Sequence, residues 1–162
     1  MMTLSNPACA LLDLVVLPLV QRQLLLPATA LAEVVSKWQS HTLPGVPQWC
    51  IGAFEWRQRR LPLIDFERWS GAPGTSGNWL AVFNRSQSDL PFTHYGVLLA
   101  DRPRLLRLRN NQLRGIPTPP NVGIDAMVLV EGERYAIPDL LALEQQIYRL
   151  STAFHSPPVQ PD

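Results

Sequence analysis

The chain has 162 residues, of which 46% are hydrophobic and only 17% are charged, so it has enough apolar surface to fold, which excludes an intrinsically disordered chain. Its 14 basic and 13 acidic residues give a formal net charge of +1, which is too weak to imply a nucleic-acid or membrane partner. The 16 prolines are about twice the usual share of ~5%, which disfavours long helices and favours short strands joined by turns.

The first predicted elements are strands close to the N-terminus. Residues 14–20 and 23–26 are apolar and flank a polar pair, a pattern typical of a β-hairpin. Residues 28–32 favour a single helical turn, and a strand follows at residues 33–35. A loop is expected over residues 36–47, which contain serine, histidine, glycine and two prolines.

Strands also dominate the middle of the chain. Residues 49–56 alternate with the period of two that is typical of a strand, and residues 61–66 form another apolar run after a polar turn at residues 57–60. Residues 70–77, with the sequence SGAPGTSG, combine glycine, proline and serine without an apolar period. This segment is predicted to be a linker.

The second half of the chain also predicts short strands joined by turns, and it ends in a helix. Turns are predicted at residues 110–112 and 131–134, and a last strand covers residues 135–137. Pro138 suits the first position of a helix. An apolar helical face then forms, at steps of three and four, from Leu140, Leu143, Ile147 and Leu150. The other strands predicted in this half cover residues 78–84, 94–100, 105–109 and 124–130.

These elements predict an all-β fold of two small barrels followed by a C-terminal helix. The first barrel is expected at residues 14–69, the second at 78–137 and the helix at 138–150, all within one domain over residues 11–152. Each half alone would be near the lower size limit for independent stability, so a shared core is expected. Residues 153–162 are rich in proline and are predicted to form a flexible tail.

The most apolar stretch, residues 8–27, does not predict a membrane span. Asp13 and Arg22 interrupt it, and no basic residue precedes it as in a secretory signal. Cys9 and Cys50 have no metal-ligand spacing, which favours buried, reduced thiols. We therefore expect a cytoplasmic protein without direct membrane insertion.

No arrangement of residues supports catalysis, so the chain is not expected to be an enzyme. His41, His94 and His155 are scattered along the sequence, and neither a metal site nor a cofactor is expected. Phosphate-binding and nucleophile motifs are absent from the sequence. Asp65 and Glu67 could be imagined as an acid–base pair, but a carboxylate between a strand and a turn more often caps the turn.

An arginine-rich segment, residues 102–114, stands out in an otherwise balanced chain. Leu106 and Leu108 alternate with Arg107 and Arg109, which predicts a strand whose arginines face solvent. A solvated face is the first interpretation, and a docking surface for an acidic protein is the second. A small-barrel nucleic-acid-binding module is kept as an alternative function, although the segment has no aromatic residue for base stacking. The five arginines are Arg102, Arg104, Arg107, Arg109 and Arg114.

An ordered set of short motifs runs through the chain. An apolar–Glu–apolar strand, a proline-containing turn, a strand that begins with glycine and ends in arginine, and a Leu-Pro run ending in Ile-Asp-Phe follow one another. Glu33 and Arg57 are 24 positions apart (57 − 33 = 24). The motifs occupy residues 31–35, 43–47, 52–57, 61–66, 96–101 and 135–140. Their order and spacing, over roughly residues 14–150, resemble the CheW-like family of chemotaxis adaptors.

The resemblance implies two five-stranded SH3-like barrels that share a core. It also implies a non-catalytic scaffold that couples a methyl-accepting chemoreceptor to a CheA-type histidine kinase. In the family, the first barrel meets the regulatory domain of the kinase. A groove between the barrels receives the cytoplasmic tip of the receptor.

The partner-binding residues that the resemblance implies surround a Glu33–Arg57 pair, which we expect to meet on neighbouring strands and to be half-buried. Leu31 and Val35 would share the strand face of Glu33 or fill the core. Trp56 would be an interface anchor or a core residue. The full set is Leu31, Glu33, Val35, Gly52, Trp56, Arg57 and Gln58.

The chain departs from the family pattern at three positions beside Arg57. Glu55 replaces an asparagine, Trp56 a leucine, and Gln58 a glycine that would allow a positive φ. Gln58 therefore predicts a different or strained turn, and Glu55 adds a carboxylate that could compete with Glu33. This drift suggests a divergent adaptor, similar to the accessory CheW-like proteins of type IV pilus chemosensory systems that serve twitching motility.

Overall fold

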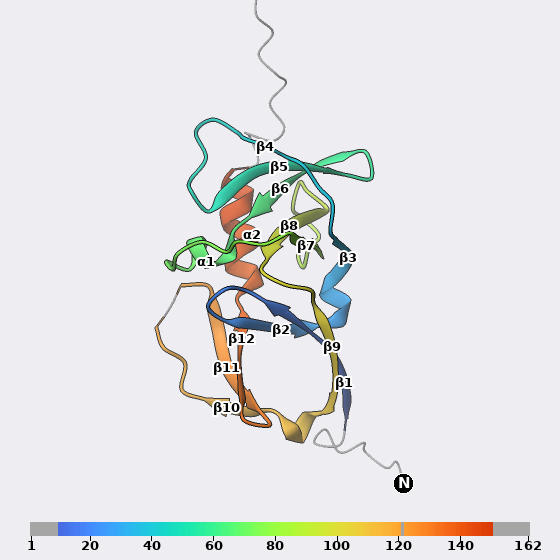
Figure 1. Ribbon diagram of the computed structural model, residues 1–162, viewed down its shortest axis with the longest axis vertical. Coiled ribbons are helices and arrows are strands. Elements are labelled where there is room, and N and C mark those ends of the chain that lie inside the picture. Colours follow the sequence, from blue (N-terminus) through green and yellow to red (C-terminus); the bar gives the residue numbers. More distant parts are fainter. Residues whose placement is uncertain (1–9, 121, 151–162) are drawn as a thin grey trace, which may run out of the picture.

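The computed structural model describes residues 10–120 and 122–150 and contains two six-stranded sheets, one above the other in Figure 1. We call them the lower barrel and the upper barrel. The lower barrel has, in spatial order, β10 (Arg114–Ile116), β11 (Ile124–Val130), β12 (Glu133–Pro138), β2 (Gln23–Pro27), β1 (Leu11–Pro18) and β9 (Arg104–Arg109). The upper barrel has β3 (Leu31–Val35), β7 (Trp79–Asn84), β8 (His94–Leu99), β6 (Arg59–Ile64), β5 (Cys50–Trp56) and β4 (Ser40–His41).

Each sheet curls toward closure because its two end strands are consecutive in the chain. Residues 36–39 join β3 to β4, and residues 110–113, which include the 3-10 turn η3 (Asn110–Gln112), join β9 to β10. A flat sheet of this size would be about 24 Å wide, since neighbouring strands lie ~4.8 Å apart. Connections this short reach at most about 17 Å. The sheets therefore cannot be flat, in agreement with the predicted barrels.

The N-terminal hairpin forms as predicted. β1 pairs antiparallel with β2, with Leu14 opposite Pro27 and Pro18 opposite Gln23. Both faces of β1 are buried over residues 14–17, which explains why these four residues are all apolar rather than alternating. The 3-10 turn η2 (Ala28–Ala30) then carries the chain from the lower to the upper barrel, where a helical turn was expected.

The prediction that the barrels follow one another along the chain, at residues 14–69 and 78–137, is wrong. The lower barrel combines the N-terminal hairpin with strands from the end of the chain, because β12 pairs in parallel with β2 and β1 pairs with β9. The upper barrel takes the intervening residues, with β6 and β8 paired in parallel. The segment 70–77 therefore connects two parts of the upper barrel. These pairings join strands distant in sequence, which local patterns cannot reveal.

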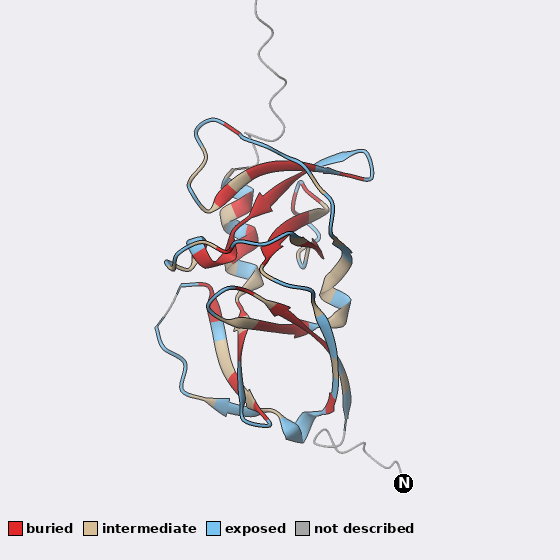
Figure 2. Ribbon diagram, viewed as in Figure 1, coloured by how far each residue is buried: buried red, intermediate tan, exposed pale blue. Residues whose placement is uncertain are grey.

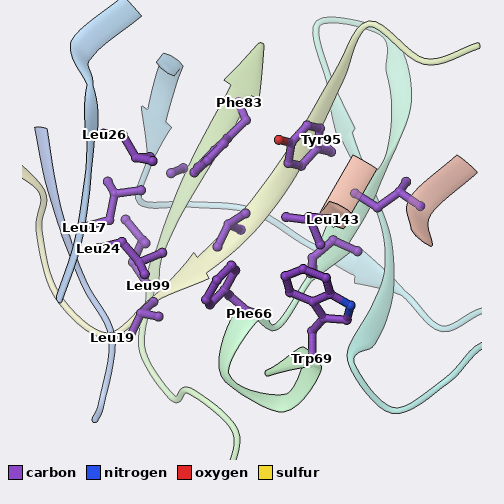
Figure 3. Packing of buried hydrophobic residues seen from close by; sticks show 14 of the residues in the cluster. Leu17, Leu19, Leu24, Leu26, Phe66, Trp69, Phe83, Tyr95, Leu99 and Leu143 are labelled. Carbon is purple, nitrogen blue, oxygen red and sulfur yellow. The ribbon is translucent and has the colours of Figure 1, made fainter. Parts of the chain in front are cut away.

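The two barrels share a core, as expected. The largest buried cluster draws Leu17 and Leu24 from the lower barrel and Phe66, Phe83 and Tyr95 from the upper barrel, and Figure 3 shows these side chains meeting between the sheets. A second cluster fills the lower barrel and a third fills the upper barrel. Figure 2 shows that the buried residues lie in strands of both barrels, β1 and β2 in the lower and β5, β6 and β8 in the upper.

The C-terminal helix α2 (Leu140–Arg149) packs on the upper barrel through the predicted apolar face. Leu143 and Ile147 are fully buried. The helix starts two positions later than expected, because Pro138 ends β12 and Asp139 caps the helix by accepting from the N–H of Ala142 at 3.0 Å. Among the described residues, no helix is long and apolar enough to cross a membrane.

Candidate functional site

The β5–β6 hairpin ends in a two-residue turn, Arg57 and Gln58, that has an unusual backbone. Both residues have positive φ angles, 49° for Arg57 and 64° for Gln58, a region that costs an L-residue roughly 1–2 kcal/mol. The strained turn predicted from the loss of glycine is therefore present. The matching turn of the lower barrel, between β11 and β12, uses Glu131 and Gly132 with φ angles of 49° and 83°.

The turn places Arg57 beside Glu33, and Trp56 joins them. The Arg57 guanidinium lies 3.9 Å from the Glu33 carboxylate and 4.4 Å from the centre of the Trp56 ring. The Trp56 indole N–H donates a hydrogen bond to the same Glu33 oxygen. We call these three residues the Glu33–Trp56–Arg57 cluster. The carboxylate thus receives one hydrogen bond and forms one ion pair with residues that are adjacent in sequence.

Glu33 and Arg57 do not lie on neighbouring strands, contrary to the prediction. β7, β8 and β6 separate β3 from β5 in the sheet, and the two residues approach only because the sheet curls and the hairpin tip extends past its edge. The long Trp56 side chain spans the remaining gap from inside the barrel.

The ion pair is also more exposed than expected. The side chain of Arg57 is 66% exposed and that of Glu33 is 43% exposed, and Figure 2 shows the tip of the hairpin as exposed. Pairs as exposed as this contribute about 0–1 kcal/mol to stability. The ion pair is therefore not needed to hold the fold together, and its charged groups are accessible to a partner.

Trp56 itself is only 7% exposed and belongs to the core of the upper barrel. Its ring lies 4.6 Å from the imidazole of His94, centre to centre. The indole thus offers little surface of its own, and it orients the charged groups of Glu33 and Arg57.

Three other predicted site residues have mainly structural surroundings. A β-bulge between Leu31 and Glu33 shifts the alternation, so Leu31 packs against the cluster between the barrels whereas Val35 packs against the interior of the upper barrel. Leu31 and Val35 therefore do not share one face. Gly52 is buried with φ 151°, and a Cβ there would lie 2.1 Å from the carbonyl oxygen of His41. Glycine is needed for the close approach of β4 to β5.

Polar residues that the sequence analysis did not select lie next to the cluster. Arg59 donates to the hydroxyl of Thr93 at 2.8 Å, and the same hydroxyl lies 2.8 Å from Nδ1 of His94. Burial, together with the charges of Arg59, Arg57 and Arg85, lowers the pKa of His94. The repeated arginines of the turn were the only sequence feature that could have indicated this surface.

The buried carboxylates have structural partners. Asp65 caps α1 (Phe66–Trp69), as predicted, and accepts from the N–H groups of Arg68 and Thr75, so the segment 70–77 is anchored at this carboxylate. Glu67, which is 0% exposed, accepts from the N–H of Gln21 in the lower barrel at 2.6 Å. No group of three or more His, Cys, Asp and Glu suited to a metal ion occurs among the residues that the structure describes.

Glu144, a buried residue of α2 that the sequence analysis missed, anchors the helix to the β7–β8 loop. Its carboxylate accepts from the N–H and hydroxyl of Ser86 and from the hydroxyl of Tyr95 at 2.9 Å. Burial and the neighbouring Glu144 charge raise the pKa of Tyr95 well above its usual range. A lone glutamate within an apolar helical face was a sequence feature that could have indicated such a role.

The arginine-rich segment forms the solvated strand face that was the first interpretation. In β9, Leu108 is buried while Arg104 and Arg107 are exposed. Arg107 pairs with Asp13 at 2.7 Å, and Arg104 donates to the side chains of Gln23 and Tyr135. These guanidinium groups are engaged by the protein itself, so the structure gives no support to the nucleic-acid alternative.

Cys50 is a buried, free thiol, as expected, and burial raises its pKa to about 11. Cys9, His155 and residues 153–162 lie outside the described residues.

Comparison with known proteins agrees with this architecture. The CheW-like domain profile matches residues 13–147. No curated protein matches the sequence. Among solved structures, the scaffolding protein TtCheW from Thermoanaerobacter tengcongensis aligns with a TM-score of 0.66 over 80% of this chain and 90% of its own, at 14% sequence identity. A structural match at this low sequence identity shows that the two proteins share a fold.

Proposed function

The chain belongs to the CheW-like domain family, and on that premise we propose that it is a scaffold adaptor of chemotaxis signalling. It couples a methyl-accepting chemoreceptor to a CheA-type histidine kinase and acts in the cytoplasm through its contact surfaces, without catalysis. Its direct partners are the regulatory domain of the kinase and the cytoplasmic tip of the receptor.

The Glu33–Trp56–Arg57 cluster is the observation that supports this proposal most strongly. An exposed ion pair adds little to stability, yet here a buried indole orients it and a strained turn carries one of its members. Backbone strain of this kind is concentrated at functional sites. The cluster also joins the glutamate and arginine whose spacing resembles that of the family.

Within this proposal, the cluster is the centre of the kinase contact. Arg57 suits the role because its planar guanidinium binds a carboxylate with two parallel hydrogen bonds and stacks on an aromatic ring. The remaining partner-binding residues, Leu31, Val35, Gly52 and Gln58, shape or border this surface. The departures at Glu55, Trp56 and Gln58 favour a divergent accessory adaptor, for which we propose a type IV pilus chemosensory system as the setting.

A pull-down with the immobilised regulatory domain of a CheA-type kinase tests the proposal. The wild-type chain should be retained saturably, and Arg57→Ala should reduce retention while circular dichroism shows an unchanged fold. Arg107→Ala is the matched control, because it removes one exposed member of an ion pair on the lower barrel. Equal retention of the wild type and Arg57→Ala would reject the assigned site, and no retention of any variant would reject the adaptor role.

A further inference from the structure

Beside the Glu33–Trp56–Arg57 cluster lies a basic surface formed by Arg57, Arg59 and Arg85 together with Thr93 and His94, which we call the arginine surface. We infer that it binds an acidic protein segment, and that Arg59 is the residue on which this binding depends most. The inference deepens the proposed function, because it names the chemistry of the partner at the site assigned to the kinase contact.

The members of the arginine surface are linked by contacts. Trp56 and Arg59 are opposite each other across the β5–β6 hairpin, so their side chains lie on the same face. Arg59 and His94 meet at the hydroxyl of Thr93. Arg85 joins from the next loop, where its N–H bonds to the carbonyl of Thr93 and its guanidinium donates to the carbonyl of Leu90. The surface is thus continuous across β6, β8 and the β7–β8 loop.

Positive charge on this surface exceeds the nearby negative charge. Of Arg57, Arg59 and Arg85, only Arg57 forms an ion pair with a carboxylate among the described residues. Arg59 and Arg85 donate to a hydroxyl and to carbonyl groups, which leave their charge unneutralised. The lowered pKa of His94, due to burial and then to these three arginines, is consistent with a local positive field.

On the opposite face of the same hairpin, one positive charge faces one negative charge. Glu55 and Arg60 lie directly opposite each other in the β5–β6 pairing, and both are exposed. Opposite charges in this arrangement attract each other. Because side chains alternate along a strand, Arg59 and Arg60 point to different faces. In this hairpin, Arg60 therefore lies opposite a carboxylate, whereas its neighbour Arg59 lies opposite Trp56.

The turn gives independent support. Gln58 is exposed and has a φ of 64°, a position where glycine would relieve strain. The lower barrel uses Gly132 at the corresponding place. A side chain at a strained position is expected where that side chain has a functional role. The Gln58 amide can donate a hydrogen bond to a carboxylate bound at Arg57 or Arg59.

Carboxylates fit this surface better than the phosphates of a nucleic acid. Three guanidinium groups against the one carboxylate of Glu33 leave a small excess of charge, which suits two or three acidic side chains. Binding to single strands also uses exposed aromatic rings, and the indole of Trp56 beside this surface is 7% exposed and lies against the His94 imidazole. Glu33 would further repel a closely spaced polyphosphate.

The test compares Arg59→Glu with Arg60→Glu in the full chain. The two variants change the net charge equally at adjacent exposed positions on opposite faces. Binding of a poly-L-glutamate peptide is measured by calorimetry at low and high salt, with poly-L-lysine and a single-stranded oligonucleotide as comparison probes. We expect Arg59→Glu to weaken poly-L-glutamate binding about tenfold and Arg60→Glu less than about twofold. Wild-type binding should weaken as salt rises.

Equal weakening by the two variants, or no binding of poly-L-glutamate at low salt, would overturn the inference. Tighter binding of the oligonucleotide with the same dependence on Arg59 would overturn it in favour of a phosphate polymer. If Arg59→Glu unfolds the chain, Arg59→Gln against Arg60→Gln repeats the comparison. Loss of kinase-domain retention in Arg57→Ala, together with full retention in Arg59→Glu, would reject the acidic segment and leave the adaptor role intact.

Discussion

Substituting Gln58 by glycine should stabilise the protein, although the change removes a side chain. At φ 64° the backbone of Gln58 costs roughly 1–2 kcal/mol relative to glycine. Glycine in turn loses more conformational entropy on folding, by roughly 0.5–1 kcal/mol. The difference predicts that Gln58→Gly raises the free energy of unfolding by about 0.5–1 kcal/mol.

The lower barrel supplies the reverse experiment. Gly132 has φ 83°, and a Cβ at that position would meet no atom within 4 Å, so Gly132→Gln tests backbone strain without a steric clash. It should lower the free energy of unfolding by about 0.5–1 kcal/mol, for the same two reasons with opposite sign.

Equilibrium unfolding in urea measures both changes, and thermal melting checks them, since ~1 kcal/mol corresponds to about 2–4 °C in a chain of this size. A double substitution, Gln58→Gly with Gly132→Gln, should lie close to the wild type, because the turns are in different barrels and such sites are additive. Destabilisation by Gln58→Gly would refute the assignment of strain to the β5–β6 turn, and an unchanged stability in Gly132→Gln would refute the strain cost assumed for both turns.

Other predictions concern the core. Gly52→Ala should cost more than about 2 kcal/mol of unfolding free energy, because its Cβ would overlap a β4 carbonyl oxygen. The control Gly115→Ala, whose Cβ would meet no atom within 4 Å, should change the unfolding free energy by less than ~0.5 kcal/mol. Similar urea midpoints for the two variants would contradict this. Cys50 has a buried thiol with a pKa of about 11, so it should react with a disulfide reagent at pH 8 only when the protein unfolds. The reaction is measured in a variant that lacks the other cysteine, and fast reaction in native buffer would show that the thiol is accessible. Tyr95→Phe should cost about 1–3 kcal/mol by removing the hydrogen bond to the Glu144 carboxylate, and Glu144→Ala should cost more because it leaves several donors unpaired; the reverse order in urea unfolding would reject this anchoring role.

The elements that the sequence predicted well are those fixed by local pattern. The β1–β2 hairpin follows from two apolar runs around a polar pair, and α2 follows from its apolar face. The short strand β10 was missed, because Arg114–Ile116 has no apolar alternation. The order of the strands was also missed, since the pairing of β12 with β2 joins residues 136 and 24. Only folding in three dimensions selects such a contact.

The candidate site was predicted only in part, again because its geometry depends on contacts between distant parts of the chain. The spacing of Glu33 and Arg57 led to the pair, but their exposure and the role of the Trp56 indole depend on how the sheet curls. The bulge after Leu31 reversed the expected face of that residue, and bulges have no reliable sequence pattern. Arg59 and His94 were not selected, because they come together only through the parallel pairing of β6 with β8.

Calorimetric titration of the full chain with the regulatory domain of a CheA-type kinase tests the adaptor role most directly. The variant Glu33→Ala with Arg57→Ala should bind at least about tenfold more weakly than the wild type. The matched variant Asp13→Ala with Arg107→Ala, which removes an exposed ion pair from the lower barrel, should bind like the wild type. Full affinity in the folded Glu33→Ala, Arg57→Ala variant would contradict the account.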